Sequence, residues 1–208
     1  MVWHTVPKAV QLLFPKRIWT ADGLENQVYL TFDDGPVPGV TDFVLNELAK
    51  RGQQATFFLV GDNLRKNRAL GREIIASGHH IGNHTFNHLN GWKTSDQDYL
   101  KNIQAFDQEF EASLGLKTDL FRPPYGLIRN SQAKALLKTK KLIMWNVLSG
   151  DYDQRIPGKQ ILSKSIDHTR SGSIVVFHDQ EKTVEVLPKV LPPYLDFLLE
   201  RGFITGLL

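Results

Sequence analysis

The 208-residue sequence contains no cysteine. Disulfide bonds and thiolate metal sites are therefore excluded, and any bound metal ion must be held by oxygen and nitrogen atoms. A large excess of one sign of charge is also missing, since 25 Lys and Arg residues stand against 22 Asp and Glu residues, a net charge of +3. Without a block of basic residues, the sequence predicts no nucleic-acid partner.

Long hydrophobic runs are absent as well. No run approaches the roughly 20 apolar residues of a membrane-spanning helix, so we expect no integral membrane segment. The apolar stretch 9–14 is too short for the apolar region of a signal peptide and precedes no small-residue cleavage site. These absences predict a cytoplasmic location, with a cell-envelope or secreted location as the alternative if a leader has been lost. No feature of the sequence predicts the oligomeric state.

The composition that is present, 41% hydrophobic and 23% charged, is that of an ordinary globular protein. Strand-like and helix-like segments alternate without a linker or a repeat, which favours one domain. Strands are predicted over 27–32, 55–60, 79–81, 120–122, 142–147 and 173–177 and after Gly202, and helices over 41–51, 63–77, 95–114, 131–138, 159–169 and from the pair Pro192-Pro193 to Glu200. This alternation predicts an α/β fold, a single-domain distorted (β/α) barrel with about seven parallel strands.

Catalytic residues of such barrels lie at the carboxyl ends of the strands. Asp33 and Asp34 end the first predicted strand, directly before a Gly-Pro turn. Because neighbouring strand residues point to opposite faces, we expect the two carboxylates to have different roles rather than to flank one glycosidic bond. A solvated turn is the alternative interpretation of Asp-Asp-Gly taken alone.

His84 and His88 are four residues apart, a spacing that would place both imidazoles on one side of a helical turn. This arrangement suits a divalent ion such as zinc, with a carboxylate as a further ligand and one position open for water. The nearby His79 and His80 lessen the weight of the pattern. A surface pair or a satisfied core pair is the alternative.

Two other predicted strands end in polar residues. Arg122 is followed by a stiff Pro-Pro turn that leaves the backbone N–H of Tyr125 free to donate. A structural salt bridge on a turn is the alternative role for Arg122. His178 follows the apolar strand 173–177, and Asp151 follows the strand before it, so His178 is a candidate proton donor.

Four motifs taken together resemble the polysaccharide deacetylase family, carbohydrate esterase family four. They are Thr31-Phe32-Asp33-Asp34-Gly35-Pro36, His84-Thr85-x-x-His88, Arg122-Pro123-Pro124-Tyr125-Gly126 and the strand ending in His178. The family comprises metal-dependent esterases and amidases, among them chitin, chito-oligosaccharide and peptidoglycan deacetylases. The resemblance covers about residues 27–206. It implies a catalytic domain over 27–208, with residues 1–26 as an N-terminal extension packed on the barrel.

The resemblance also implies a role for each matching residue on the metal side of the site. The implied metal ligands are Asp34, His84 and His88. Asp33 would be the general base, with Arg122 holding its charge and orientation. The implied cofactor is a divalent metal ion, with zinc as the first expectation and cobalt or another divalent ion as alternatives.

On the leaving-group side, the resemblance implies that His178 is the general acid, tuned by Asp151. The backbone N–H of Tyr125 would help to stabilise the oxyanion. The fourth motif of the family is usually Asp-x-x-Asp-Trp, whereas this sequence has Leu148 and Tyr152 at its first and last positions.

The residue two before the acid histidine is Val176, where the family usually has leucine. This change and those in the fourth motif alter the expected walls of the acyl and sugar groove. Aromatic residues that could also line the groove, or instead fill the core, are Phe14, Trp19, Trp92 and Tyr152.

The sequence therefore predicts a metal-dependent hydrolase that removes N-acetyl groups from N-acetylhexosamine residues of a chitin-like or peptidoglycan-like glycan. One alternative keeps the same site but makes it an O-acetyl esterase or another amide hydrolase. A second alternative is a catalytically silent glycan-binding module, against which the complete set of base, ligand and acid residues argues. Signatures of other hydrolases, such as Gly-x-Ser-x-Gly and His-Glu-x-x-His, are absent.

Overall fold

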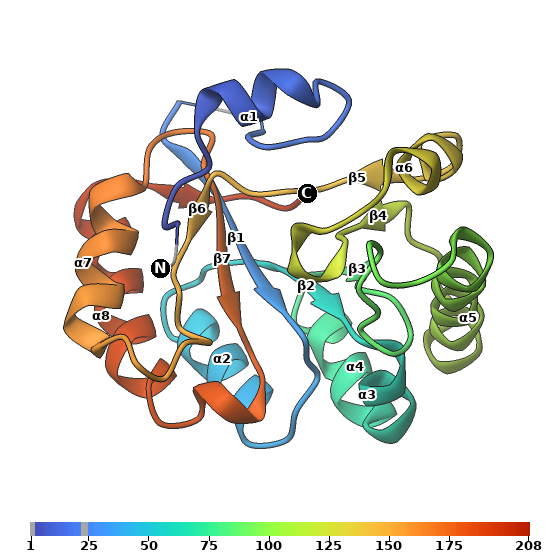
Figure 1. The fold of residues 1–208 in the computed structure, drawn as a ribbon. Helices are drawn as coiled ribbons and strands as arrows, with labels where there is room; N and C mark the ends of the chain where they lie inside the picture. The colour runs from blue at the N-terminus through green and yellow to red at the C-terminus, as the bar shows by residue number, and fades with distance from the viewer. Residues whose placement is uncertain (1–2, 22–24) are drawn as a thin grey trace.

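The structure, a computed structural model, describes residues 3–21 and 25–208 (Figure 1). A curled parallel sheet forms its centre, with strand order β5-β4-β3-β2-β1-β7-β6 and with β8 paired to β1. The strands are β1 (Gln27–Asp33), β2 (Thr56–Leu59), β3 (His80–Asn83), β4 (Leu120–Phe121), β5 (Lys141–Leu142), β6 (Val147–Leu148), β7 (Ile174–His178) and β8 (Ile204–Thr205). The predicted α/β barrel with about seven parallel strands is confirmed.

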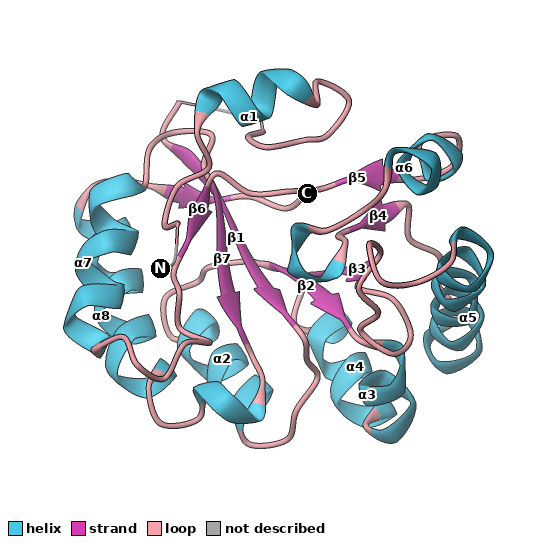
Figure 2. Cartoon of the chain, viewed as in Figure 1, coloured by secondary structure: helices cyan, strands magenta, loops and turns pink. Residues whose placement is uncertain are grey.

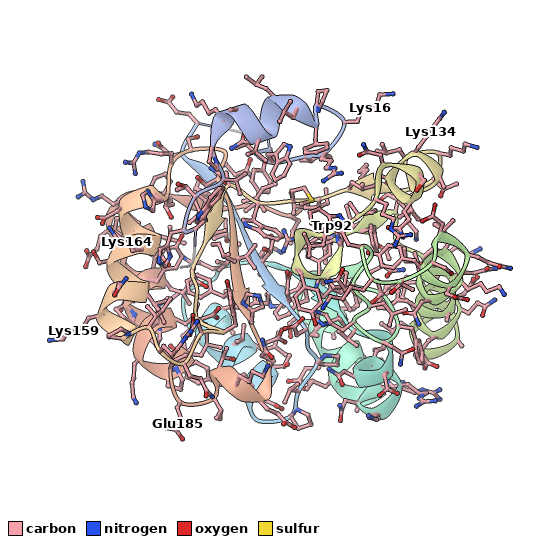
Figure 3. The ribbon with its side chains drawn as sticks, in the orientation of Figure 1. Lys16, Trp92, Lys134, Lys159, Lys164 and Glu185 are labelled. Carbon is pink, nitrogen blue, oxygen red and sulfur yellow. The ribbon has the colours of Figure 1, made fainter. Side chains whose placement is uncertain are left out.

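Helices cover the outside of this sheet (Figure 2). They are α1 (Lys8–Leu13), α2 (Val40–Ala49), α3 (Gly61–Lys66), α4 (Arg68–Ala76), α5 (Asp96–Leu114), α6 (Asn130–Leu136), α7 (Gly158–His168) and α8 (Leu187–Glu200). Figure 3 shows Lys134, Lys159 and Lys164 extending outward from α6 and α7. In the part of the chain that the structure describes, no helix has the length and apolar character needed to cross a membrane.

Strand β1 lies inside the sheet between β2 and β7, so its residues from Val28 to Asp33 are buried on both faces. Val28, Leu30 and Phe32 pack against the helices in the main hydrophobic core. Tyr29, on the opposite face, belongs to a smaller cluster inside the barrel. The register with β7 places Asp33 directly beside His178, so both side chains leave the sheet at its carboxyl edge.

The segment predicted as one strand over 142–147 is instead two short strands. Its first part, β5, pairs with β4, and its last part, β6, pairs with β7. Because the two parts serve opposite edges of the curled sheet, the chain crosses from one edge to the other between them. The segment 3–21 lies along this crossing, with bridges from Thr5 to Val147 and from Ile18 to Ile143. The division into residues 1–26 and 27–208 stays a prediction.

Two predicted helices differ from those observed. The helix expected over 63–77 is broken at Asn67, which has non-helical angles (φ −126°, ψ 47°) and donates side-chain hydrogen bonds to the carbonyls of Pro36 and Asn63. The last helix begins at Leu187, so Pro192 and Pro193 lie inside it rather than in its first turn. Burial of its apolar face outweighs the lost backbone hydrogen bonds.

Candidate active site

A pocket of about 660 Å³ opens at the carboxyl edge of the sheet. Its lining brings together six of the eight predicted site residues, namely Asp33, Asp34, His84, His88, Tyr125 and His178. The other two, Arg122 and Asp151, are fully buried and contact residues of this lining. Residues from five separate strand ends therefore meet at one place, as expected for a barrel of parallel strands.

Both adjacent aspartates face this pocket, contrary to the expectation that they point to opposite faces. Asp33 is the last residue of β1, whereas Asp34 has left the strand and has a left-handed φ of 83°. This backbone conformation is uncommon for a residue with a side chain and turns the Asp34 carboxylate back toward the site. Different roles for the two carboxylates remain consistent with their different contacts.

His84 and His88 lie on a loop after β3, and the helical turn expected from their spacing is wrong. Left-handed φ values at Thr85 (63°) and His88 (55°) fold the loop so that the two imidazole centroids are 5.1 Å apart. The side chain of Asn83 fixes the loop by accepting a hydrogen bond from the Thr85 N–H at 2.8 Å. Asn102 on α5 accepts two more backbone N–H groups of the same loop.

The ligand atoms of Asp34, His84 and His88 all lie within 4.8 Å of one another. Oδ1 of Asp34 is 3.5 Å from Nε2 of His84 and 3.0 Å from Nε2 of His88. Among the residues that the structure describes, this buried oxygen has no hydrogen-bond donor with suitable geometry. An orphaned carboxylate oxygen between two imidazole nitrogens is the donor set expected for a divalent ion.

The protonation of His84 fits the same conclusion. Its Nδ1 lies 2.8 Å from the carbonyl oxygen of Arg122, which fixes the proton on Nδ1 and leaves a lone pair on Nε2. Burial lowers the pKa of His84 to about 4, against the opposing attraction of Asp33, so the ring is neutral near pH 7. The lone pair therefore faces the Asp34 carboxylate, an arrangement that a cation between them would stabilise.

The charge of Asp34 is also maintained. Burial acts to raise the pKa of its carboxyl group, but its contact with His88 and the nearby positive charge of His178 outweigh burial and lower that pKa below its ordinary range. The carboxylate of Asp34 is thus ionised at neutral pH, as a candidate metal ligand must be. One carboxylate and two imidazoles suit a divalent ion with oxygen and nitrogen ligands.

Arg122 holds Asp33 from behind the pocket. Its Nη1 donates to Oδ1 of Asp33 at 2.6 Å and to the hydroxyl of Thr31 at 2.7 Å, and its Nη2 donates to the carbonyl of Met144 at 3.0 Å. The guanidinium also lies 4.1 Å from the centroid of the Phe58 ring. Arg122 is therefore a buried, fully bonded partner of Asp33 and not a salt bridge on a surface turn.

Tyr125 lies on the rim of the pocket, where it is 61% exposed. The Pro-Pro turn leads into a left-handed φ of 61° at this residue. Its ring packs edge-on against His88, with centroids 4.7 Å apart. The ring of Tyr125 therefore helps to position a candidate metal ligand, a contact that the sequence did not predict.

His178 and Asp151 form a close pair on the other side of the pocket. Nδ1 of His178 lies 2.7 Å from Oδ1 of Asp151, and the His178 backbone N–H donates to Oδ2 at 2.8 Å. Burial alone would lower the pKa of His178, but the charge and hydrogen bond of Asp151, with Asp34 and Asp33, raise it to about 9. The imidazole is thus cationic at neutral pH and presents Nε2 as a proton donor.

Replacing Asp151 tests this electrostatic coupling. Asp151→Asn removes the charge that stabilises the protonated ring, so the pKa of His178 falls and the proton is lost at lower pH. We expect the high-pH limb of the kcat/KM profile for acetate release to move down by about 1–3 pH units. Asp153→Asn is the matched control because Asp153 pairs with Arg155 instead. A limb at the same pH in Asp151→Asn and wild type would contradict the pairing.

The positions that depart from the family motif also line the pocket. Leu148, Tyr152 and Val176 all belong to the lining, and the ring of Tyr152 packs edge-on against His178 at 5.1 Å. Tyr152 therefore packs against the candidate proton donor while forming part of the wall. The other candidate groove aromatics, which lie away from the pocket lining, are Phe14, Trp19 and Trp92.

Sequence reasoning missed two residues at the site. Trp145 lines the pocket from the crossing between β5 and β6, inside the segment 142–147 that was predicted as a single strand. Asp179 is fully buried directly after β7, and burial together with the charge of Asp34 raises the pKa of its carboxyl group to about 8. Its position one residue beyond His178, at a strand end, was the signal available in the sequence.

Comparison with known proteins identifies the family of the chain. A sequence model of the family described as polysaccharide deacetylase matches residues 20–142. A peptidoglycan-N-acetylglucosamine deacetylase of Bacillus cereus is 34% identical over an alignment of 188 residues, and the match covers 84% of each chain. A chitooligosaccharide deacetylase of Azorhizobium caulinodans is 31% identical over an alignment of 158 residues, and the match covers 74% of each chain.

Solved structures of the same family have a similar fold. The crystal structure of the Bc1960 peptidoglycan N-acetylglucosamine deacetylase matches with a TM-score of 0.84 and 26% identity, covering 98% of this chain and 95% of that one. A pseudoenzyme of carbohydrate esterase family four from Bacillus anthracis matches with a TM-score of 0.80 and 26% identity, covering 91% of this chain and 66% of that one. The extent of these matches shows that this chain belongs to the polysaccharide deacetylase family of hydrolases.

Proposed function

We propose that the protein is a metal-dependent hydrolase that removes N-acetyl groups from N-acetylhexosamine residues of a peptidoglycan-like or chitin-like glycan. The observation that carries this proposal is the convergence of three parts in one pocket. These parts are the Asp34, His84 and His88 cluster, the Asp33–Arg122 pair and the His178–Asp151 pair. The names of the relatives support a glycan substrate of this class.

Asp34, His84 and His88 would hold the metal ion, and zinc is the ion that we propose for this donor set. A bound divalent ion supplies Lewis acidity, which makes a water molecule easier to deprotonate and polarises the acetyl carbonyl. Three protein ligands leave room for both the water and the substrate. No thiolate is available to compete for the site, because the chain has no cysteine.

Asp33 would act as the general base. Its Oδ1 is occupied by Arg122, while its Oδ2 lies 4.0 Å from Nε2 of His84 and so faces the candidate metal site. The guanidinium fixes the orientation of the carboxylate through this charged hydrogen bond. Oδ2 is therefore the atom that would accept the proton of a water molecule attacking the acetyl carbon.

His178 would act as the general acid on the opposite side of the acetyl group. Its cationic ring would donate the Nε2 proton to the sugar nitrogen as the carbon–nitrogen bond breaks, because an amide anion is a very poor leaving group. The backbone N–H of Tyr125 would stabilise the negative charge on the carbonyl oxygen, a contribution of roughly 10²–10³ in rate for such donors.

The pseudoenzyme among the structural relatives makes a silent glycan-binding module the main competing function. The candidate base, acid and ligand residues are all present in this chain, and the base and acid candidates each have a charged partner. A module that only binds glycans has no need for a buried Asp33–Arg122 pair and a cationic His178. These contacts favour an active hydrolase.

The cytoplasmic location expected from the sequence stays a prediction.

Acetate release over a substrate panel tests the proposal. Zinc-loaded protein is incubated with chito-oligosaccharides, peptidoglycan fragments and O-acetylated xylan, and zinc content is measured on the same preparation. We expect acetate from the N-acetylated substrates, and none from the same protein carrying His178→Ala. Release from acetylated xylan alone would instead assign an O-acetyl esterase. Glycan binding without any acetate release would assign a silent module.

A further inference from the structure

The loop that presents the two catalytic-site aspartates is bonded from both sides. From one side, the side-chain amide of Asn63 donates to the carbonyl of Asp34 at 2.8 Å, and that of Asn67 donates to the carbonyl of Pro36 at 3.2 Å. From the other side, the backbone N–H of Asp179 donates to the carbonyl of Asp33 at 3.1 Å. The backbone of this loop is thus fixed residue by residue.

The side chain of Asp179 completes this set of bonds. Its Oδ1 accepts the backbone N–H of Gly35 at 3.1 Å, and its Oδ2 accepts the hydroxyl of Thr41 at 2.6 Å. The same hydroxyl accepts the backbone N–H of Val37 at 2.8 Å. One buried carboxyl group therefore bonds Gly35 directly and Val37 through Thr41. These two residues lie before and after Pro36 in the turn that follows Asp34.

The carboxyl group of Asp179 packs directly against the Cα atom of Gly35. A Cβ atom added to Gly35 would lie 2.1 Å from Oδ2 and 2.7 Å from Oδ1 of Asp179. Only a residue without a side chain allows Asp179 to approach the loop this closely. Gly35 and Asp179 therefore act as one unit, in which the missing side chain of one makes room for the carboxyl group of the other.

We propose that Asp179 is a positioning residue for the metal site, which holds the left-handed turn at Asp34 and so fixes the direction of the Asp34 carboxylate. The inference rests on the proposed function, because it takes Asp34 as a metal ligand. Asp34 has a φ of 83° and adopts it next to a glycine, a conformation that needs support from its surroundings. Asp179 supplies that support without touching the substrate pocket.

Direct measurement of metal affinity tests this role. Zinc binding to metal-stripped protein is measured by competition with a chromophoric chelator for wild type, Asp179→Ala and Asp179→Asn. We expect Asp179→Ala to weaken zinc binding by about 10–100-fold, the range found for residues that orient metal ligands. Asp179→Asn, which keeps one acceptor and the shape of the side chain, should recover part of this loss.

The matched control is Gln132→Ala, which removes another buried polar side chain whose hydrogen bonds lie with Gly91 and Arg129. It should lower thermal stability and leave zinc affinity unchanged.

A double variant tests whether Gly35 and Asp179 act together. Gly35→Ala should weaken zinc binding. Adding Asp179→Ala to it should lower zinc affinity by less than the two single effects combined, because the methyl group then has space. Wild-type affinity in Asp179→Ala, or fully independent losses, would overturn the inference. Wild-type protein that binds no divalent ion would overturn the proposed function itself.

Discussion

Asp33→Asn is expected to lower acetate release by about 10²–10⁴-fold, the usual contribution of a general base. Asparagine keeps the shape of the side chain but cannot accept a proton from water at neutral pH. Zinc affinity should fall far less than in His88→Ala, because Asp33 is not one of the three converging ligands. The measurement is the rate of acetate release at saturating zinc and saturating chito-oligosaccharide.

The control for this variant is Asp119→Asn, which neutralises an exposed carboxylate paired with Lys141 at the far end of the barrel from the pocket. Its rate should equal that of wild type. A rate for Asp33→Asn within tenfold of wild type would show that another group takes the proton. The second carboxylate of the pocket, Asp34, would then be the first candidate.

Arg122→Met is expected to destabilise the fold by about 3–5 kcal/mol, because it leaves the Asp33 carboxylate buried without its partner. Methionine fills much of the volume next to Phe58 but replaces none of the hydrogen bonds. The free energy of unfolding is measured by urea denaturation of metal-free protein. Acetate release should also be lost, since Asp33 is no longer oriented.

A double variant separates the charge from the packing. Asp33→Asn combined with Arg122→Met removes both charges, so it should be more stable than Arg122→Met alone. Arg65→Met is the exposed control, whose pairing with Asp62 is on the surface and is worth about 0–1 kcal/mol. Equal destabilisation by Arg65→Met and Arg122→Met would contradict the account of the buried pair.

The sequence was sufficient to predict the barrel and which strand ends carry the chemistry. Asp33 and His178 end strands of clear β pattern, and parallel strands that are neighbours in the sheet bring such ends together. The sequence pattern could not predict the local backbone conformation at these strand ends. Asp and His adopt a left-handed φ more often than most residues, but their types do not show that Asp34 and His88 are the ones that do, and these two angles help to bring the candidate ligands together.

Long-range contacts explain the other differences. The crossing that places Trp145 in the pocket arises because residues 141–148 contribute strands to both edges of the curled sheet, and the order of strands in the sheet cannot be read from the sequence pattern. Asp179 was overlooked because its partners, Gly35 and Thr41, lie far from it in the sequence. A pattern along the chain can identify strand ends, but not which backbone groups a buried carboxyl will bond.

The central claim is that Asp34, His84 and His88 hold the divalent ion on which deacetylation depends. The most direct test titrates metal-stripped protein with zinc while acetate release from chito-oligosaccharide and bound zinc are measured together. We expect the rate of acetate release to rise in proportion to bound zinc, up to one ion per chain. We expect His88→Ala neither to bind zinc tightly nor to release acetate. Acetate release by metal-stripped protein at the rate of the zinc-loaded protein would contradict the claim.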